Sequence, residues 1–265
     1  MSGSRVTTSG EQPLIDYHLH VIAHGDRPMT VENILRYCEV ARARGIRQMG
    51  ITEHDRYLEE IDLAAFQEAR ELSHDVELRL GIEIDFVSGS EERMDDDATA
   101  LPYDYVIGSV HRVHNEEVDR ATDQRIYDRC ETYDLYAAYY ANVRKAVLSG
   151  RFEILGHPDL IKIFRHFPDR DIIPILEETA DAVAESGVVI DVNSAGLRKP
   201  VGEVYPARDF LEMFHKRGVP IVLSSDAHAP DQVAMGYDTS LALVREVGYR
   251  EVATFRNHKR GTLSL

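Results

Sequence analysis

Histidine is the residue type whose placement in this sequence most strongly suggests chemistry. Seven of the twelve histidines end or closely follow a short apolar run, and these are His18, His20, His24, His54, His111, His157 and His228. In Asp16-Tyr-His18-Leu-His20 the two histidines are separated by one residue. Side chains alternate along a strand, so both histidines point to the same face. Two imidazoles on one face can bind a single metal ion, and His24 in the following loop could add a third ligand.

Two carboxylates stand in comparable positions. Glu83 is flanked by two isoleucines, where an ionised carboxylate is costly to bury unless a cation neutralises it. A salt bridge to one Arg or Lys is the alternative interpretation. Asp226 and His228 repeat the two-residue spacing of the first histidine pair. We therefore treat Glu83 and Asp226 as candidate metal ligands.

These residues are more informative together than singly. A lone histidine is more often part of the core or the surface than a ligand, but histidines at the ends of successive strands predict a site at the carboxyl face of a barrel. Seven histidines with Glu83 and Asp226 make nine candidate ligands, enough for two or three divalent ions. Nitrogen and oxygen donors without thiolate favour zinc, iron or manganese. Such ions activate water for hydrolysis, including phosphoryl displacement. The other histidines are expected to bind no metal, and they are His74, His114, His166, His215 and His258.

Short apolar or alternating runs predict the strands that must position these side chains. They cover residues 14–17, 47–52, 77–86, 105–110, 153–156, 188–192 and 220–224. Apolar residues at helical spacing predict helices over residues 31–44, 63–73, 123–149, 171–186, 207–217 and 232–247. We interpret the acidic run at residues 91–97 as a solvated loop.

Alternating strands and helices over roughly 250 residues favour one α/β domain with a barrel of parallel strands inside and helices outside. An open doubly wound sheet is the alternative. We prefer the barrel because the candidate residues follow strand after strand, whereas an open sheet gathers its ligand contacts near one switch point. Seven strands make a distorted barrel. We expect residues 1–13 to form a flexible N-terminal tail and residues 14–265 a single catalytic domain.

The composition excludes several classes of function. The 265 residues are 43% hydrophobic, enough for a substantial core. The 30 basic and 46 acidic residues give a formal net charge of −16, so we expect no nucleic acid and no membrane partner. The sequence shows neither an apolar signal region nor a run of about 18 apolar residues. Cys38 and Cys130 lack C-x-x-C spacing, which indicates no thiolate zinc site and favours a cytoplasmic location.

Several motifs together resemble the polymerase and histidinol phosphatase (PHP) family. They are His18-x-His20, Thr52-Glu-His54-Asp55, Gly81-x-Glu83, Gly108-Ser-Val-His111, Gly156-His157 and Ser225-Asp-Ala-His228. Further segments are similar to the stand-alone histidinol-phosphate phosphatases of that family. These segments are Glu83-Ile-Asp85-Phe86, Asp159-Leu-Ile-Lys162-Ile-Phe164 and Asp191-Val-Asn193-Ser-Ala-Gly196-Leu197-Arg198-Lys-Pro200. The resemblance covers the chain after about residue 13.

The resemblance implies a distorted (β/α)7 TIM-like barrel, the PHP fold, that holds two or three divalent ions, either zinc, iron or manganese. The ligand sets that match by motif are His18, His20, Glu83 and Asp226 for the first ion, Glu83, His111 and His157 for the second, and His24, His54 and His228 for the third. Glu83 thus bridges two ions.

The activity implied by the resemblance is metal-dependent hydrolysis of L-histidinol phosphate to L-histidinol and phosphate, a step of histidine biosynthesis. A metal-activated hydroxide attacks phosphorus while the ions neutralise charge on the phosphoryl oxygens. Asp226 or His228, or a water that they hold, protonates the leaving alkoxide.

Three basic residues are candidates for binding the substrate. Lys162 and Arg198 match positions that bind the substrate phosphate, and surface solvation is the alternative. Arg112 follows His111 where relatives often carry an aromatic residue, so it could add phosphate affinity or select another phosphoester. Ile163 stands where a second basic residue is common. Candidates for the group that receives the substrate ammonium are Asp85, Asp159 and Glu116.

Two other functions remain open at this stage. The same barrel and metal ions could hydrolyse a different small phosphomonoester, such as a nucleotide or a sugar phosphate. A non-catalytic, metal-stabilised module is the second alternative, and the filled set of nine ligand positions disfavours it.

Overall fold

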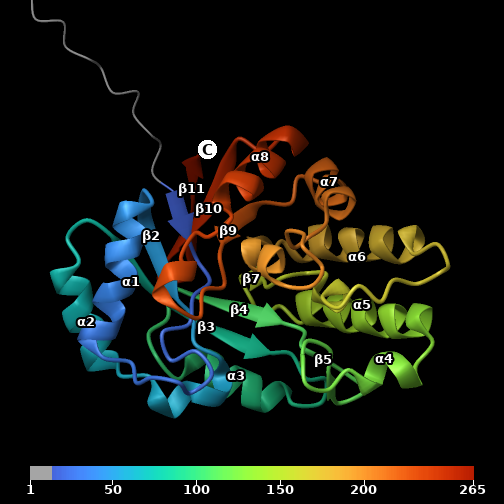
Figure 1. The fold of residues 1–265 in the computed structure, drawn as a ribbon, viewed down its shortest axis with the longest axis horizontal. Coiled ribbons are helices and arrows are strands. Elements are labelled where there is room, and N and C mark those ends of the chain that lie inside the picture. The colour runs from blue at the N-terminus through green and yellow to red at the C-terminus, as the bar shows by residue number, and fades with distance from the viewer. Residues whose placement is uncertain (1–13) are drawn as a thin grey trace, which may run out of the picture.

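The computed structural model describes residues 14–265, so the predicted tail at residues 1–13 lies outside the described residues. Within the described part, parallel strands form one sheet in the order β1-β2-β3-β4-β7-β8-β9 (Figure 1). Their bounds are β1 Leu14–Asp16, β2 Ile46–Ile51, β3 Glu77–Asp85, β4 Tyr105–Ser109, β7 Ile154–Leu155, β8 Val189–Asn193 and β9 Ile221–Ser224. The Tyr17 N–H donates to the Leu223 carbonyl at 3.1 Å, so the first and last strands meet. The nearly closed barrel confirms the predicted (β/α)7 architecture over the open sheet.

Helices cover the outside of this barrel (Figure 1). They are α1 Val31–Ala43, α2 Leu63–Leu72, α3 Glu91–Thr99, α4 Arg125–Arg129, α5 Thr132–Leu148, α6 Ile173–Ser186, α7 Arg208–Lys216 and α8 Tyr237–Val247. Short 3-10 helices follow several strands, and they are η1 Asp55–Glu60, η2 Leu160–Lys162, η3 Ser194–Arg198 and η4 Pro230–Gln232. Local signals set the helix ends: Thr30 caps α1 by accepting from the Asn33 N–H, and Gly187, at φ 75°, ends α6.

Aromatic side chains fill the barrel interior. Tyr17 and Tyr105 stack with their ring centroids 5.1 Å apart, and the Tyr105 hydroxyl donates to the Tyr17 carbonyl at 2.7 Å. Gly50 leaves room for this ring, since a Cβ there would meet the Tyr105 hydroxyl at 1.6 Å. The central strands are buried on both faces, as in parallel sheets covered by helices. This packing fixes the carboxyl ends of the strands.

An antiparallel hairpin, which the sequence patterns did not predict, packs at the amino ends of β3 and β4. It consists of β10 (Glu251–Arg256) and β11 (Lys259–Ser264). The Phe255 carbonyl accepts from Arg79 Nε at 2.8 Å, and the Asn257 N–H donates to Asp104 at 2.9 Å, just before β4 begins. The hairpin therefore covers the end of the barrel opposite the candidate residues.

The prediction of a loop at residues 91–97 is wrong, because these residues form most of α3. Glu91 and Glu92 lie in the first turn, where negative charge favours a helix. Arg93 pairs with Asp97 one turn later at 2.7 Å, and Met94 is buried against the core. One buried residue and an ion pair are a weak helical signal among so many acidic residues.

The segment 123–149 is also not one continuous helix. Cys130, at φ −110° and ψ 141°, ends α4, and α5 begins at Thr132. Before this break the chain forms a small hairpin of β5 (Arg112–Val113) and β6 (Glu116–Glu117), at the carboxyl end of β4. These two features place residues 112–124 beside the barrel mouth.

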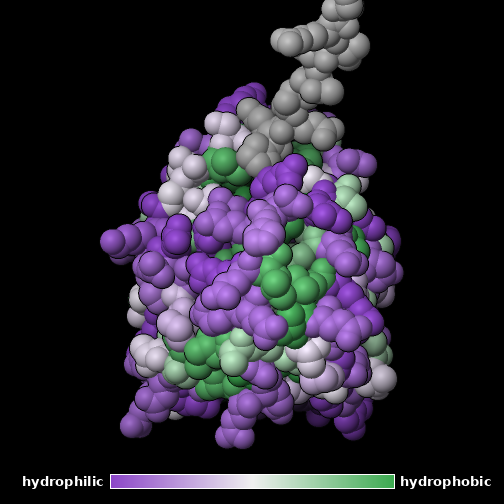
Figure 2. Space-filling view, turned by 90° about the vertical axis from the view of Figure 1, so that its left-hand side faces the viewer, coloured by the Kyte–Doolittle hydropathy of each residue, from purple (hydrophilic) through white to green (hydrophobic). Residues whose placement is uncertain are grey.

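The surface over α1 and α2 is mainly hydrophilic, with small separate hydrophobic areas (Figure 2). Exposed ion pairs such as Arg36 with Glu32 on α1 contribute to this surface. Among the described residues, no helix combines the length and the apolar character needed to span a bilayer.

Candidate metal centre

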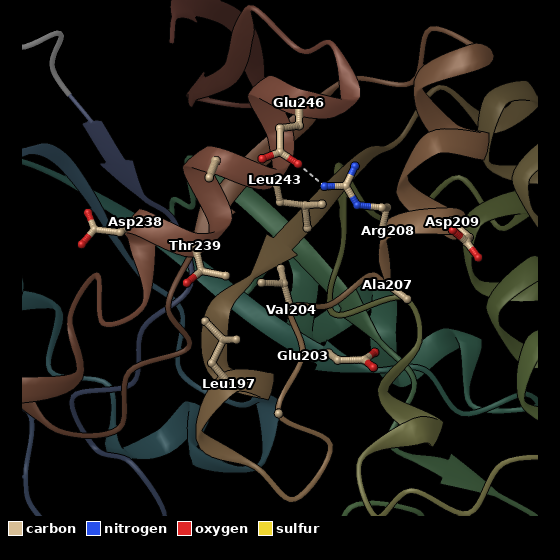
Figure 3. A pocket seen from close by; sticks show the side chains of 12 residues that line it. Leu197, Glu203, Val204, Ala207, Arg208, Asp209, Asp238, Thr239, Leu243 and Glu246 are labelled. Atoms are coloured by element: carbon tan, nitrogen blue, oxygen red, sulfur yellow. Dashed lines mark hydrogen bonds and ion pairs between the residues drawn. The ribbon is translucent and has the colours of Figure 1, made fainter.

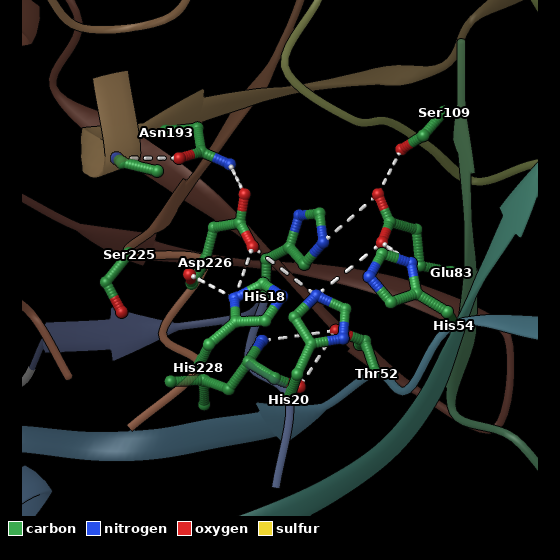
Figure 4. A network of polar contacts seen from close by, with 12 residues as sticks. His18, His20, Thr52, His54, Glu83, Ser109, Asn193, Ser225, Asp226 and His228 are labelled. Atoms are coloured by element: carbon green, nitrogen blue, oxygen red, sulfur yellow. Dashed lines mark hydrogen bonds and ion pairs between the residues drawn. The ribbon is translucent and has the colours of Figure 1, made fainter. Parts of the chain in front are cut away.

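Histidines and carboxylates converge at the carboxyl ends of the strands (Figure 4). The loop after β1 carries His18 and His20, and single residues follow or end the next strands, namely His54 after β2, Glu83 in β3, His111 after β4 and His157 after β7. Asp226 and His228 follow β9. Parallel strands place their carboxyl ends together, which is why segments from both ends of the chain meet here.

Glu83 is the centre of this cluster. Its carboxylate oxygens contact imidazole nitrogens at 2.8 Å for His54, 3.2 Å for His157, 3.3 Å for His18, 3.5 Å for His20 and 3.6 Å for His111. Ser109 Oγ also donates to Glu83 at 2.6 Å. Among residues 14–265, the ion-pair partners of Glu83 are all histidines, so the alternative of a salt bridge to Arg or Lys is not found.

Asp226 connects the first and last strands within the cluster. Its Oδ1 lies 3.4 Å from His20 Nε2 and 3.4 Å from His228 Nδ1. Asn193 Nδ2 donates to Oδ2 at 3.4 Å. The Asp226 and His228 side chains are 16% and 23% exposed, so they lie on the open side of the cluster, whereas Glu83 is buried.

The geometry of these donor atoms fits divalent ions. Four overlapping groups offer ligand atoms within 4.8 Å of one another, and they are His18, His20 and Glu83; Glu83, His111 and His157; His20, His54 and His228; and His18, His157 and Asp226. Several ring nitrogens, including His18 Nε2 and both nitrogens of His20, are buried without a hydrogen-bond partner in the described part of the chain. Buried unpaired nitrogens are costly unless a cation binds them.

Glu83, His20 and His228 are in protonation states that suit metal binding, whereas Glu83 raises the pKa of His18 and His111 even though burial lowers it. Burial opposes a charge on Glu83, but the imidazoles of His18 and His54 hold its pKa well below its ordinary value. Burial, with His54 and His228 nearby, lowers the pKa of His20 well below its usual range. Burial also lowers the pKa of His228 to about 4. Glu83 is therefore ionised, and His20 and His228 keep a free lone pair at neutral pH.

His24 lies at the edge of the cluster. Its ring centroid is 4.5 Å from that of His228 and 6.1 Å from that of His54. It is exposed, and His20 takes its place in the tight group with His54 and His228. The third ligand set implied by the motifs thus centres on His20, with His24 adjacent.

Asp191 is a buried carboxylate to which the sequence patterns gave no role. Its Oδ2 lies 3.0 Å from His18 Nδ1 and accepts from the His157 N–H at 3.4 Å. Asn193 Nδ2 donates to the same oxygen at 3.1 Å. Asp191 therefore orients candidate ligands from two other strands.

Two more buried carboxylates hold the backbone around the cluster. Asp16 accepts from the Ser225 N–H at 2.8 Å, which fixes the residue before Asp226. Glu53 accepts from the N–H groups of Val21 and Ile22 at 2.6 and 3.0 Å, in the loop that follows His20. The available sequence signal was their position, since each lies within two residues of a candidate ligand.

The backbone is strained at two of the candidate ligands. His157 has φ 23° and Asp226 has φ 50°, both in the left-handed region that residues other than glycine rarely adopt. Such conformations cost on the order of 1–3 kcal/mol each and are concentrated at functional sites. Gly156, just before His157, leaves room for Ser109, because a Cβ there would meet Ser109 Oγ at 2.2 Å.

A cavity of about 640 Å³ opens onto the cluster. Of the basic residues predicted to bind substrate, Arg112 lines it and pairs with Asp85 at 3.4 Å and Glu117 at 2.6 Å. The other charged residues of its rim were missed by the sequence analysis, and they are Arg56, Glu117, Asp119, Arg120 and Lys199. Lys199 lies in the Asp191–Pro200 segment, where it was given no role, and the other four lie in no motif, so only the fold brings them together.

The structure places Lys162 outside the set of residues that line this cavity. Its Nζ lies 2.9 Å from Asp159 and 3.1 Å from Glu203, and donates to the Val204 carbonyl at 3.0 Å. These contacts occupy all three ammonium donors. The predicted phosphate role of Lys162 would therefore require one of them to be exchanged.

Arg198 lies behind Asp226. Its Nη2 donates to the carbonyls of Ser225 at 2.8 Å and Asp226 at 3.2 Å. Its Nη1 is buried without a hydrogen-bond partner among the described residues. One side of this guanidinium supports the backbone, and Arg198, like Lys162, lies outside the set of residues that line the cavity.

A second cavity, of about 750 Å³, lies between η3, α7 and α8 (Figure 3). Apolar side chains such as Leu197 form part of its wall. Arg208 pairs with Glu246 across it, while Asp209 and Asp238 point away (Figure 3). Its charged groups do not converge on one point, unlike those around Glu83.

Comparison with known proteins agrees with this geometry. Residues 16–195 match the PHP domain model, so the chain belongs to the PHP domain family, as the motifs indicated. It is 35% identical over 264 residues to a probable histidinol-phosphatase of Deinococcus radiodurans, covering 93% of this chain and 98% of that protein. It is 24% identical to the histidinol-phosphatase of Bacillus subtilis, covering 85% and 97% of the two chains.

A solved structure shares the fold. It is histidinol phosphate phosphatase from Lactococcus lactis, in complex with zinc, L-histidinol and phosphate. The TM-score is 0.76 with 21% sequence identity, over 94% of this chain and 98% of that one.

Proposed function

We propose that this protein is a metal-dependent phosphomonoesterase that hydrolyses L-histidinol phosphate to L-histidinol and phosphate. The observation that carries the proposal is the set of five imidazoles around Glu83 at the carboxyl end of a PHP barrel. The names of the relatives, and the histidinol and phosphate bound to the Lactococcus lactis protein, support the choice of substrate.

Two or three divalent ions complete the site in this proposal. The residues that would hold them are His18, His20, Glu83 and Asp226; Glu83, His111 and His157; and His54 and His228 with His20 or His24. These nitrogen and oxygen donors suit zinc, iron or manganese. When bound, such ions lower the pKa of water and offset charge on phosphoryl oxygens.

The protein's own groups perform the remaining tasks. The leaving alkoxide of histidinol needs a proton, and we assign its delivery to a water that Asp226 or His228 holds, because the pKa of both side chains is lowered and neither carries a proton of its own at neutral pH. Both side chains line the cavity. We also assign contacts with the phosphate to Arg198, beside Asp226, and to Arg112 at the rim, each of which must first move from its present contacts. A phosphate role for Lys162 stays a prediction.

We further propose that the protein works in the cytoplasm on small-molecule substrates, without nucleic acid. Its cysteines, Cys38 and Cys130, are both free thiols, which suits a reducing compartment. The formal net charge of −16 disfavours contact with a phosphate backbone.

The test is phosphate release by the purified protein, with its metal content measured by elemental analysis. L-histidinol phosphate is compared with nucleotide and sugar phosphates, before chelation, after chelation and after addition of zinc or manganese. We expect the highest kcat/KM for histidinol phosphate, loss of activity on chelation and recovery with metal. No hydrolysis by the metal-replete protein, or a preference for another ester, would contradict the proposal.

A further inference from the structure

The cavity above the metal cluster has an uneven distribution of unpaired charge. Arg56 and Lys199 line it, and no carboxylate lies within 4.0 Å of either in the described chain. Arg56 lies in η1, just after His54, and Lys199 directly follows η3.

The three carboxylates that the sequence offered as partners for the substrate ammonium already contact other groups of the protein. Asp159 is buried against Lys162 at 2.9 Å, and Glu116 pairs with Arg129, and neither belongs to the cavity lining. Asp85 lines the cavity, but it accepts from the N–H of the histidine after β4 at 3.3 Å and contacts its ring at 3.2 Å. None of the three is free to receive a cation.

Two further rim carboxylates differ sharply from each other. Glu117 is held between Arg112 and Arg120, each at 2.6 Å. Asp119 lines the same cavity, and among residues 14–265 it has no Lys, Arg or His nitrogen within 4.0 Å. Once the metal cluster and these ion pairs are set aside, the cavity keeps two cations, Arg56 and Lys199, and one anion, Asp119.

The backbone holds Asp119 near the metal cluster on the His111 side. The Val118 N–H donates to the His111 carbonyl at 2.9 Å. The Tyr127 hydroxyl donates to the Val118 carbonyl at 2.8 Å. Asp119 directly follows this doubly anchored residue and lines the cavity.

We propose that Asp119 receives the ammonium group of the substrate and thereby selects phosphomonoesters whose alcohol carries a positive charge. The charges left in the cavity are of the two signs that a phosphomonoester with one cationic group requires. Leu160, Ile163 and Tyr205 also line the cavity and provide apolar surface for a ring between these ends. This inference rests on the proposed function, and it adds the residue that discriminates between esters.

The test compares Asp119→Asn with the wild type on two esters whose alcohols share the imidazolylpropyl skeleton and differ in the ammonium group. One is L-histidinol phosphate, and the other is imidazolylpropyl phosphate, which lacks the ammonium. We expect Asp119→Asn to raise KM for histidinol phosphate about 10- to 100-fold with kcat changed far less, because a charge-assisted hydrogen bond is lost. For imidazolylpropyl phosphate the wild type and the variant should have the same KM.

Two further variants and one binding measurement make the test specific. Asp119→Glu keeps the charge and should restore most of the preference, while Glu116→Gln removes a nearby carboxylate outside the cavity and should change nothing. Calorimetry should show L-histidinol binding to Asp119→Asn about 10-fold or more weakly than to wild type.

The outcomes separate the two proposals. The role of Asp119 alone is overturned if the wild type is active and Asp119→Asn keeps the preference for histidinol phosphate. It is also overturned if Asp119→Asn loses activity on both esters to the same extent. A metal-replete wild type that hydrolyses neither ester overturns the proposed function, and the role of Asp119 with it.

Discussion

Nδ1 of His18 lies 3.0 Å from the Asp191 carboxylate, and both side chains are buried. The contact joins the first strand of the barrel to β8. It directs His18 Nε2 towards Glu83, 3.3 Å away. A carboxylate behind a metal-binding imidazole fixes both its tautomer and its orientation.

We therefore expect Asp191→Asn to weaken metal binding about 10- to 100-fold while the fold is kept, because Asn has the shape of Asp without its charge. Metal titration of the chelated protein measures the effect, and circular dichroism checks the fold. Unchanged affinity in a folded variant would show that Asp191 is only structural.

Glu83→Gln should remove the bridging carboxylate. We expect fewer bound ions per chain by elemental analysis and a loss of at least about 10³-fold in phosphate release, since metal ions and their activated water supply the main chemistry. His74→Ala is the matched control, because His74 is exposed and outside the cluster. Full activity in Glu83→Gln would show that the cluster around Glu83 does not carry the hydrolysis.

Metal binding should stabilise the fold. At an ion concentration about 100 times Kd, binding to the native state adds about 2.7 kcal/mol to the free energy of unfolding. The melting temperature of the chelated protein should therefore rise by several degrees on addition of zinc or manganese, as followed by calorimetry. Glu83→Gln should show a smaller rise, and an equal rise in both proteins would place the stabilising ions elsewhere.

Gly156→Ala should damage the site through packing. The new Cβ would lie 2.2 Å from Ser109 Oγ, the group that donates to Glu83 at 2.6 Å. We expect a loss of about 1–3 kcal/mol in the free energy of unfolding, measured by denaturant titration, and lower activity. Adding Ser109→Ala removes the clashing hydroxyl and should recover part of the stability, and no recovery would locate the strain elsewhere.

Lys162 and Arg198 should respond differently to replacement. Lys162→Met leaves the buried Asp159 unpaired, so we expect the free energy of unfolding to fall by about 3 kcal/mol. Arg198→Met should instead raise KM for every phosphomonoester tested, because it removes a free donor beside Asp226. Denaturant titration and steady-state kinetics distinguish the two effects. A stable Lys162→Met variant with a raised KM would support the phosphate role predicted from the motif.

The spacing of His18 with His20, and of Asp226 with His228, together with the alternation of strands and helices, predicted the barrel and the candidate ligands. The barrel prediction is confirmed because the strand period is local, and the candidate ligands lie together because parallel strands bring their carboxyl ends to one place. Glu83 could be singled out from the sequence because a carboxylate in an apolar strand requires a cation.

Only the tertiary structure decided which partners these residues meet. No local pattern places Asp191 behind His18, engages Lys162 with Asp159, or leaves Asp119 unpaired above the metal cluster. Such contacts depend on the paths of loops between strands and on pairing between residues far apart in the chain. A sequence period reports which face a residue occupies, but it carries no information about the side chain that approaches that face from another strand.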